Sequence, residues 1–300
     1  MRLKIFFSFL FIILFVFLLA VYWFVPLGDV VSFDFKPKNY NFSINGEDMQ
    51  FYSNLRFKGS DISYNILDCP LSKKNDMEYA FDIVSNKTRL SFYPVASGEE
   101  ISITCDDSER FEGGLFIAGE GGPINITKTE NFNVILHGKI LLIRESTCER
   151  PNIAIHELFH VLGFKHSNNL NNIMYNISKC SQIIGEDNIN LIDQLYSIPS
   201  YPDLSFENID SSMVSRYLDT NISIRNNGLR ESEMAKIIIY ADGKNIKEIE
   251  LKPIDIGYGI TISLTNIFIN KLNVDSLEYV IDSDFDEIDR ENNRAVLKIK

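Results

Sequence analysis

Residues 156–166 read His-Glu-Leu-Phe-His-Val-Leu-Gly-Phe-Lys-His. His156 and His160 are four positions apart, so on a helix both imidazoles project from one face, within reach of one metal ion. Glu157 lies beside the first of them and can reach a metal-bound water. Gly163 tolerates a positive φ, so the helix can end there and turn, which brings His166 to the same ion. Three neutral histidines leave a fourth position open, which is typical of catalytic rather than structural zinc.

The alternative interpretation is a chance pattern on an amphipathic helix. The chain has four His among its 300 residues, and three of them lie in this one stretch. The pattern His-Glu-x-x-His alone would occur by accident in roughly one of a few hundred such chains, and the added Gly and third His lower that frequency by about another thousandfold. Coincidence is therefore a poor explanation, and the sequence predicts a metal site.

The residues around this stretch are predicted to form both helices and strands. Helices are expected over 72–85, 151–162 and 187–197, because apolar residues recur at helical spacing and the middle one starts with Pro and ends before Gly163. Strands are expected over 62–67, 89–95, 101–105, 112–118, 133–136 and 139–143. These elements predict one mixed α/β domain over residues 29–198, followed by a Pro-Ser-Tyr-Pro linker.

The stretch resembles the signature of the metzincin zinc peptidases, His-Glu-x-x-His-x-x-Gly-x-x-His followed by a Met-turn. Met174 lies eight residues after His166, and the resemblance implies that its side chain forms a hydrophobic floor beneath the metal. Ser167 and the Met174-Tyr175 pair are most similar to the matrixin branch. The resemblance implies an α+β fold with a mixed sheet, an active-site helix and a C-terminal helix. It also implies zinc endopeptidase activity on protein or peptide substrates.

The resemblance also assigns roles to single residues. His156, His160 and His166 would bind one catalytic zinc, while Glu157 would take a proton from the attacking water and pass it to the leaving amine. One segment sits where matrixins have the edge strand that pairs with the substrate backbone: Leu115, Phe116, Ile117 and Ala118. The competing hypothesis is a surface adhesion protein whose peptidase domain is catalytically silent, and the intact histidines and Glu157 argue against it.

The sequence departs from the matrixin pattern in two places. Matrixins usually carry a second, structural zinc that needs further histidines, and here His137 alone remains. We therefore expect no such site and interpret His137 as an ordinary turn or core residue. Asn176 replaces the usual Pro after Met-Tyr.

Residues 199–300 alternate between short β-rich segments and turns. Strands are expected over 218–225, 235–240, 246–251, 259–265, 276–281 and 294–300. Roughly seven strands in about 100 residues predict an all-β, Ig-like sandwich. Three short motifs resemble the CARDB-type domain of prokaryotic surface proteins: Pro202-Asp203-Leu204, Asn226-Asn227-Gly228 and Asp289-Arg290-Glu291-Asn292-Asn293. The resemblance implies adhesion to, or holding of, a cell-surface partner.

An acidic run near the C-terminus invites a calcium interpretation. It contains Asp282, Asp284 and Asp286 at alternate positions. The run lacks the Gly and the terminal Glu of an EF-hand loop, so a solvated acidic turn is favoured. Calcium therefore has no support from this run.

The N-terminus begins with an apolar stretch over residues 5–25 that carries no charge. A helix of that length spans a bilayer core of about 30 Å, and Arg2 and Lys4 place its start on the cytoplasmic side. We therefore expect a transmembrane helix within residues 1–28, in a single-pass cell-membrane protein with an extracytoplasmic catalytic domain. A cleaved signal peptide that yields a secreted protein is the alternative.

The cysteines indicate an oxidising compartment. Cys69, Cys105, Cys148 and Cys180 are widely spaced and form no Cys-x-x-Cys pair, which argues against a zinc ribbon or redox motif. Two disulfides are expected outside the cytoplasm, and of the three pairings we favour Cys69–Cys105 and Cys148–Cys180. Four buried free thiols are the alternative.

Composition and charge exclude one class of partner. The chain carries 29 basic and 41 acidic residues, for a net charge of −12, and it has no basic block. Nucleic acid is therefore excluded as the main partner. Hydrophobic residues make up 45% of the chain, which is enough for two domain cores.

Overall fold

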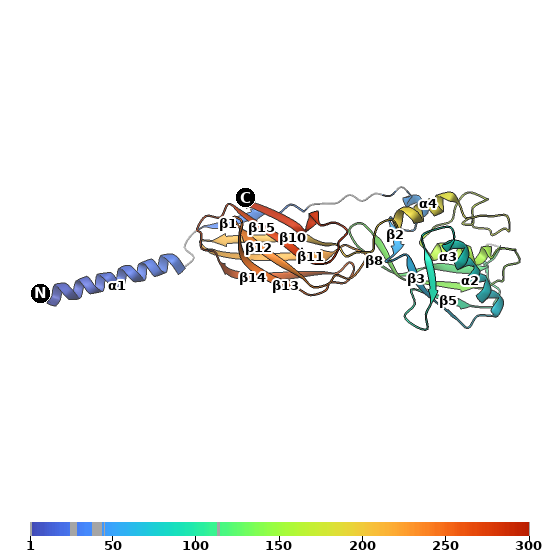
Figure 1. Ribbon diagram of the computed structural model, residues 1–300, viewed down its shortest axis with the longest axis horizontal. Helices are drawn as coiled ribbons and strands as arrows, with labels where there is room; N and C mark the ends of the chain where they lie inside the picture. The colour runs from blue at the N-terminus through green and yellow to red at the C-terminus, as the bar shows by residue number, and fades with distance from the viewer. Residues whose placement is uncertain (1, 25–28, 38–43, 45, 113–114, 300) are drawn as a thin grey trace.

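The computed structural model describes the whole chain except residues 1, 25–28, 38–43, 45, 113–114 and 300. Helix α1 (Arg2–Phe24), a β-sandwich and a mixed α/β domain follow one another along the long axis (Figure 1). The described residues form sixteen strands, four α-helices and two short 3-10 helices. The chain is thus mostly β, which corrects the α+β prediction. The strand content was underestimated because strands β1, β8 and β10, described below, were missed.

The predicted transmembrane helix is also corrected. A bilayer core of about 30 Å requires roughly 20 consecutive predominantly apolar residues in helical form. In the described part of the chain, no helix meets this combined requirement of length and apolarity.

The mixed α/β domain is built on one sheet in the order β2-β9-β5-β3-β4, with β8 on the other side of β9. Its strands are β2 (Leu55–Phe57), β3 (Asp61–Leu67), β4 (Ser91–Pro94), β5 (Ile101–Cys105), β8 (Gly119–Lys128) and β9 (Asn133–Leu142). The pairings are parallel except for that of β8 with β9, which is antiparallel. Among the described strands, β9 is the one that pairs with β8, so β8 is an edge strand of this sheet.

Three helices pack on this sheet and on one another. They are α2 (Leu71–Ser85), α3 (Asn152–Val161) and α4 (Glu186–Leu195). As the helical spacing predicted, α2 buries Met77, Ala80, Phe81 and Val84 on one face. These side chains and the apolar face of α3 belong to one core, which holds the active-site stretch on a rigid base.

A buried arginine links the C-terminal end of this domain to strand β2. Arg56 is almost fully buried and its Nη1 donates to the carbonyl oxygens of Leu195 and Ile198, while its Nε donates to Phe57 O at 3.0 Å. The guanidinium also lies 4.4 Å from the ring centroid of Tyr196. Because α4 leaves these last carbonyls without helical partners, Arg56 satisfies them and joins the end of α4 to β2.

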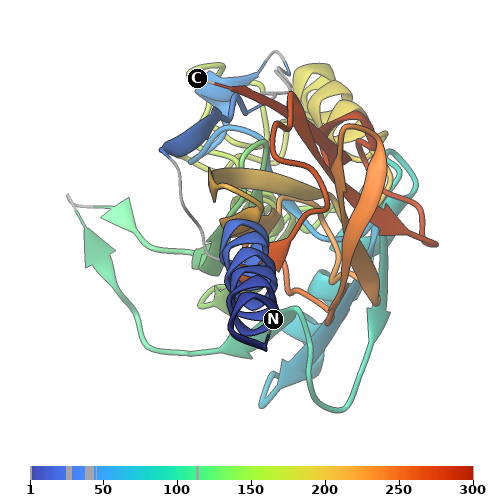
Figure 2. The same cartoon turned by 90° about the vertical axis from the view of Figure 1, so that its left-hand side faces the viewer.

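The segment before β8 forms a separate hairpin. Strands β6 (Phe111–Glu112) and β7 (Leu115–Phe116) pair only with each other, and the hairpin projects away from the domain in Figure 2. The rings of Phe111 and Phe116 lie 4.2 Å apart, centroid to centroid. Of the strand expected over 112–118, residues 113 and 114 lie outside the described residues, Glu112 pairs with Leu115, and the edge strand of the main sheet begins only at Gly119.

The C-terminal domain is a sandwich whose strands form one continuous pairing order, β13-β12-β15-β16-β1-β10-β11-β14. They are β10 (Leu204–Val214), β11 (Tyr217–Asn226), β12 (Ala235–Ala241), β13 (Lys244–Leu251), β14 (Gly259–Phe268), β15 (Ser276–Ser283) and β16 (Arg294–Ile299). Strand β1 (Val30–Asp34) lies between β10 and β16, with Phe33 in the sandwich core. The mixed α/β domain is therefore inserted between the first two strands of the sandwich, whereas the sequence placed residues 30–34 with the first domain.

The two domains share a small apolar contact. Phe132 and Val134, at the start of β9, cluster with Leu229 of the sandwich. Next to them the backbone N–H of Glu130 donates to Asn227 Oδ1 at 3.1 Å. The turn between β8 and β9 thus rests directly on the sandwich.

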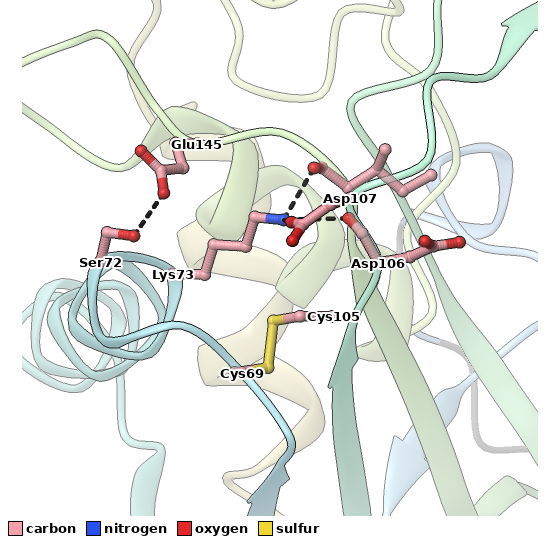
Figure 3. Close-up of a disulfide and its surroundings, with 8 residues drawn as sticks. Cys69, Ser72, Lys73, Cys105, Asp106, Asp107 and Glu145 are labelled. Atoms are coloured by element: carbon pink, nitrogen blue, oxygen red, sulfur yellow. Dashed lines mark hydrogen bonds and ion pairs between the residues drawn. A yellow bond between two sulfur atoms is a disulfide. The ribbon is translucent and has the colours of Figure 1, made fainter.

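Both favoured disulfides are present, Cys69–Cys105 and Cys148–Cys180. Near the first, the Lys73 ammonium donates to Asp106 O at 2.9 Å and to Ile143 O at 2.8 Å, as Figure 3 shows in part. Together the disulfide and Lys73 hold the ends of β5 and β9 against α2.

Candidate metal centre

Three histidines converge on one point. His156 and His160 lie on α3, and His166 follows the turn after the helix. His166 Nε2 is 3.3 Å from His156 Nε2 and 3.1 Å from His160 Nε2. Among the described His, Cys, Asp and Glu side chains, these three form the one group whose ligand atoms lie close enough together to hold a metal ion.

Backbone carbonyls set the orientation of the two helical imidazoles. His156 Nδ1 is 2.7 Å from Ile173 O, and His160 Nδ1 is 2.8 Å from Phe164 O. A carbonyl oxygen can only accept, so each Nδ1 carries the proton and each Nε2 presents its lone pair to the common point. This arrangement is typical of metal-binding imidazoles, whose other nitrogen is held by a second group.

A glycine makes the turn that brings in the third histidine. Gly163 has a φ of +97°, and a Cβ there would lie 2.6 Å from Leu55 Cδ2. Beyond the turn, the N–H of Lys165 donates to Met49 O at 2.8 Å, next to a bridge between Gln50 and Phe164. His166 is therefore held by the segment that precedes β2, about 115 residues earlier in the chain.

Met174, the residue of the predicted Met-turn, is fully buried in the same core as α3. The N–H of Ser167, which follows His166, donates to Met174 O at 2.8 Å. Asn172 Oδ1 accepts from the Met174 N–H at 2.9 Å. The turn also supplies Ile173 O, the acceptor for His156, so the methionine segment supports the first histidine directly.

Glu157 lies beside the histidines and against the edge strand. Its side chain is 5% exposed, and its Oε1 lies 2.9 Å from the position that a Cβ on Gly119 would occupy. A Cβ on Gly121 would lie 2.3 Å from the backbone oxygen of Glu157. Helix α3 therefore packs on β8 at a distance that only glycine allows.

Burial determines the proton affinity of these groups. Burial and, to a lesser extent, the nearby Glu120 carboxylate together raise the pKa of Glu157 to about 8. Burial lowers the pKa of His160 to about 4, helped by the neighbouring His156. The pKa of His156 is also lowered, first by burial. The imidazoles are thus neutral near pH 7, which is the form that binds a metal.

The nitrogen positions fit a tetrahedral ion. With Zn–N bonds of about 2.0–2.1 Å, ligand nitrogens around a tetrahedral zinc lie about 3.3 Å apart. The two measured separations, 3.1 and 3.3 Å, match that value. Three neutral nitrogen donors also match the protein donor set of catalytic zinc sites, which leave a fourth position open.

The predicted substrate segment is only partly at this site. Leu115 and Phe116 form β7, and the N–H of Ile117 donates to Arg110 O at 3.0 Å. Ala118 O accepts from the N–H groups of Ile143 and Arg144, at the end of the main sheet. The strand that contacts Glu157 is β8, which begins at the next residue, Gly119.

The remaining histidine lies elsewhere. His137 is on β9, where its Nε2 is 2.7 Å from Ser102 Oγ and its Nδ1 is 3.0 Å from Glu99 O. It therefore joins neighbouring segments of the sheet. The disulfide Cys148–Cys180, in contrast, encloses the whole candidate site, since α3, His166 and Met174 lie between the two cysteines.

Sequence reasoning missed the two glycines of β8 and the carbonyls that orient the imidazoles. Gly119 and Gly121 alternate along the strand, which was a signal for two residues facing one helix. The carbonyls of Ile173 and Phe164 gave no signal, because any residue supplies a backbone oxygen.

Comparison with known proteins identifies two families along this chain. The model of the matrixin family of peptidases matches residues 56–197, and that of the CARDB family matches residues 201–296. No curated protein matches the chain. One similar solved structure is a CARDB domain from Pyrococcus furiosus in complex with di-metal ions. It is 14% identical, has a TM-score of 0.28, and covers 33% of this chain and 88% of that chain. This chain therefore contains a matrixin-family peptidase domain followed by a CARDB domain.

Proposed function

We propose that this protein is a zinc-dependent endopeptidase that hydrolyses peptide bonds of proteins outside the cytoplasm. The observation that carries the proposal is the convergence of the ligand nitrogens of His156, His160 and His166, within the segment that the matrixin family model matches. His156, His160 and His166 would hold the zinc ion. When bound, the zinc supplies Lewis acidity, which acidifies a water molecule and polarises the carbonyl of the substrate.

Glu157 is the proposed base. Because burial raises its pKa, its carboxylate has a strong affinity for the proton of the attacking water. The same group then delivers this proton to the leaving amine. Packing against Gly119 fixes the carboxylate, so the proton acceptor does not need to be ordered during the reaction.

The substrate is proposed to bind as an extended strand along β8. The outer edge of β8 offers unpaired backbone groups, and strand addition to such an edge gives main-chain hydrogen bonds without regard to side chain. Ala118 lies at the start of this edge, while Leu115, Phe116 and Ile117 lead into it from the hairpin. The site would therefore select peptides that are locally unfolded.

Two features support an extracytoplasmic location. Both pairs of cysteines form disulfides, which persist in oxidising compartments and are rare in the cytosol. The CARDB domain would hold a partner or the substrate at the cell surface.

The test is peptide hydrolysis by purified, zinc-loaded protein and by Glu157→Ala, with the exposed Glu149→Ala as the matched control. We expect Glu157→Ala to keep zinc and to lose at least about 10³-fold in kcat/KM, whereas Glu149→Ala stays near wild type. Equal cleavage by Glu157→Ala and wild type would remove Glu157 from the mechanism. Absence of hydrolysis at full zinc occupancy would favour the adhesion hypothesis.

A further inference from the structure

A second group of buried polar side chains lies in the CARDB domain, away from the three histidines. Asp203, just before β10, is 3% exposed, and Glu287 is 9% exposed. The N–H of Leu204, the residue after Asp203, donates to Glu287 Oε2 at 2.8 Å. Two carboxylates are thus brought together inside the domain, where a charge without a partner is costly.

Two amide side chains complete the group. Asn292 Nδ2 donates to Asp203 Oδ1 at 2.9 Å, and Asn293 Nδ2 donates to Glu287 Oε1 at 2.8 Å. The oxygens of the same two amides have no hydrogen-bond partner, although the residues are only 9% and 6% exposed. Buried polar atoms nearly always have a partner. In each of these amides the Nδ2 atom faces the carboxylate, so the Oδ1 atom on the other side of the amide lacks a donor or a cation.

The charges around Asp203 also indicate that a cation is missing. The pKa of Asp203 is raised to about 7, mainly by burial, while the hydrogen bond from the Asn292 amide opposes this rise. The charged groups that contribute to the raised pKa, Glu287, Asp289 and Glu130, are all carboxylates. No Lys or Arg within the described residues forms an ion pair with Asp203 or Glu287. Negative charge therefore accumulates here without a cation from the protein.

The cluster borders a cavity through one of its members. Asn292 and Glu130 line this cavity of about 500 Å³ between the two domains, together with the basic residues Lys36, Lys128, Arg225 and Arg294. Glu130 belongs to the turn between β8 and β9 of the peptidase domain, and its N–H donates to Asn227 of the sandwich. Asn292 is therefore the member of the cluster that connects it to the contact between the domains.

We propose that this cluster binds one hard divalent cation of the calcium class, with oxygen ligands from Asp203, Asn292 and Asn293. Calcium prefers carboxylate and amide oxygens, and rotation of each amide by about 180° turns its orphaned oxygen toward the ion without changing its shape. Glu287 holds Asn293 and the Leu204 backbone in place and contributes negative charge. The site is separate from the acidic run of Asp282, Asp284 and Asp286, whose members are exposed.

A cation here would also strengthen the contact between the domains. It would neutralise carboxylates from both sides of that contact, including Glu130 of the peptidase domain. The proposal does not depend on peptidase activity, because every residue that it uses lies outside the candidate metal centre.

The test is calcium titration of the full chain, kept zinc-loaded, by isothermal calorimetry and by thermal unfolding. We expect one calcium ion per chain and a rise in Tm of at least about 5 °C at millimolar calcium. Asp203→Asn should weaken calcium binding at least about tenfold. The matched control Asp284→Asn, on the exposed acidic run, should change it less than about twofold.

Two results would overturn the proposal. One is wild-type protein that shows neither binding heat nor a Tm shift with calcium. The other is calcium binding that is lost in Asp284→Asn and kept in Asp203→Asn, because the exposed run would then be the site. Should Asp203→Asn fail to fold by near-ultraviolet circular dichroism, Asn292→Ala takes its place under the same criteria.

Discussion

The close packing of α3 on β8 makes a sharp prediction about two neighbouring glycines. A Cβ on Gly121 would lie 2.3 Å from the backbone oxygen of Glu157, whereas a Cβ on Gly122 would meet nothing within 4 Å. To restore an ordinary contact of about 3.4 Å, Gly121→Ala must push the helix away from the strand by about 1 Å. Gly122→Ala removes the same backbone freedom without that displacement, so it is the matched control.

The expected magnitude follows from this displacement. A 1 Å misplacement of catalytic groups costs about 10²-fold in rate, and overpacking of this kind costs about 1–3 kcal/mol of stability. We therefore expect Gly121→Ala to lower kcat/KM for a peptide substrate by about 100-fold. Gly122→Ala should stay within about threefold of wild type. Hydrolysis of a fluorogenic peptide, with zinc content and Tm measured on the same samples, checks this. Activity of Gly121→Ala equal to that of Gly122→Ala would refute the link between the helix–strand distance and catalysis.

Three further predictions concern stability. In zinc-free protein His160 has a pKa of about 4, whereas an unfolded histidine has a pKa of about 6.5. The unfolded chain therefore binds more protons between these two pH values. The free energy of unfolding should fall by about 3 kcal/mol as the pH drops from about 6.5 to about 4. Urea unfolding should show this slope in wild type and a flatter one in His160→Gln. Arg56→Ala leaves several buried carbonyls unpaired, so it should lower the free energy of unfolding by about 3 kcal/mol or more, measured by thermal unfolding. The control, Arg89→Ala at an exposed arginine, should lower it by less than about 0.5 kcal/mol. Equal losses in the two variants would contradict this prediction. Replacing Cys148 and Cys180 by Ser removes a crosslink with a sequence separation of 32 and should lower the free energy of unfolding by about 4 kcal/mol. An unchanged Tm in this double variant would argue against a stabilising Cys148–Cys180 disulfide.

The convergence of the three histidines could be predicted because their pattern is local. Four residues of helix and one glycine turn determine where His156, His160 and His166 point, and no distant partner is needed to read that spacing. Both disulfides and most strand positions were also predicted correctly. The disulfides could be expected from an oxidising compartment, and the strands from the short-range periodicity of apolar residues.

The features that were missed depend on tertiary contacts. Residues 119–123 read Gly-Glu-Gly-Gly-Pro, a composition that favours a turn, yet they start β8 because Gly119 and Gly121 face α3. Gly138 seemed to divide β9 into two strands, and it too faces the helix, with Val161 Cγ1 2.6 Å from the position of a Cβ. In each case the need for close helix–sheet packing overrides local propensity.

The position of β1 could not be derived from local sequence either. Val30–Asp34 pairs with β10 and β16, which lie about 180 and 265 residues later. Nothing in five residues specifies such distant partners. The mostly β character of the chain follows from these long-range pairings.

The most direct test of the zinc centre is X-ray absorption spectroscopy at the zinc edge of the purified, zinc-loaded protein. Three imidazole nitrogens and one oxygen ligand are expected, all at about 2.0–2.1 Å. Replacing any one of His156, His160 or His166 should remove one imidazole from that shell. A shell that contains sulfur, or one that is unchanged by these substitutions, would contradict the proposed zinc site.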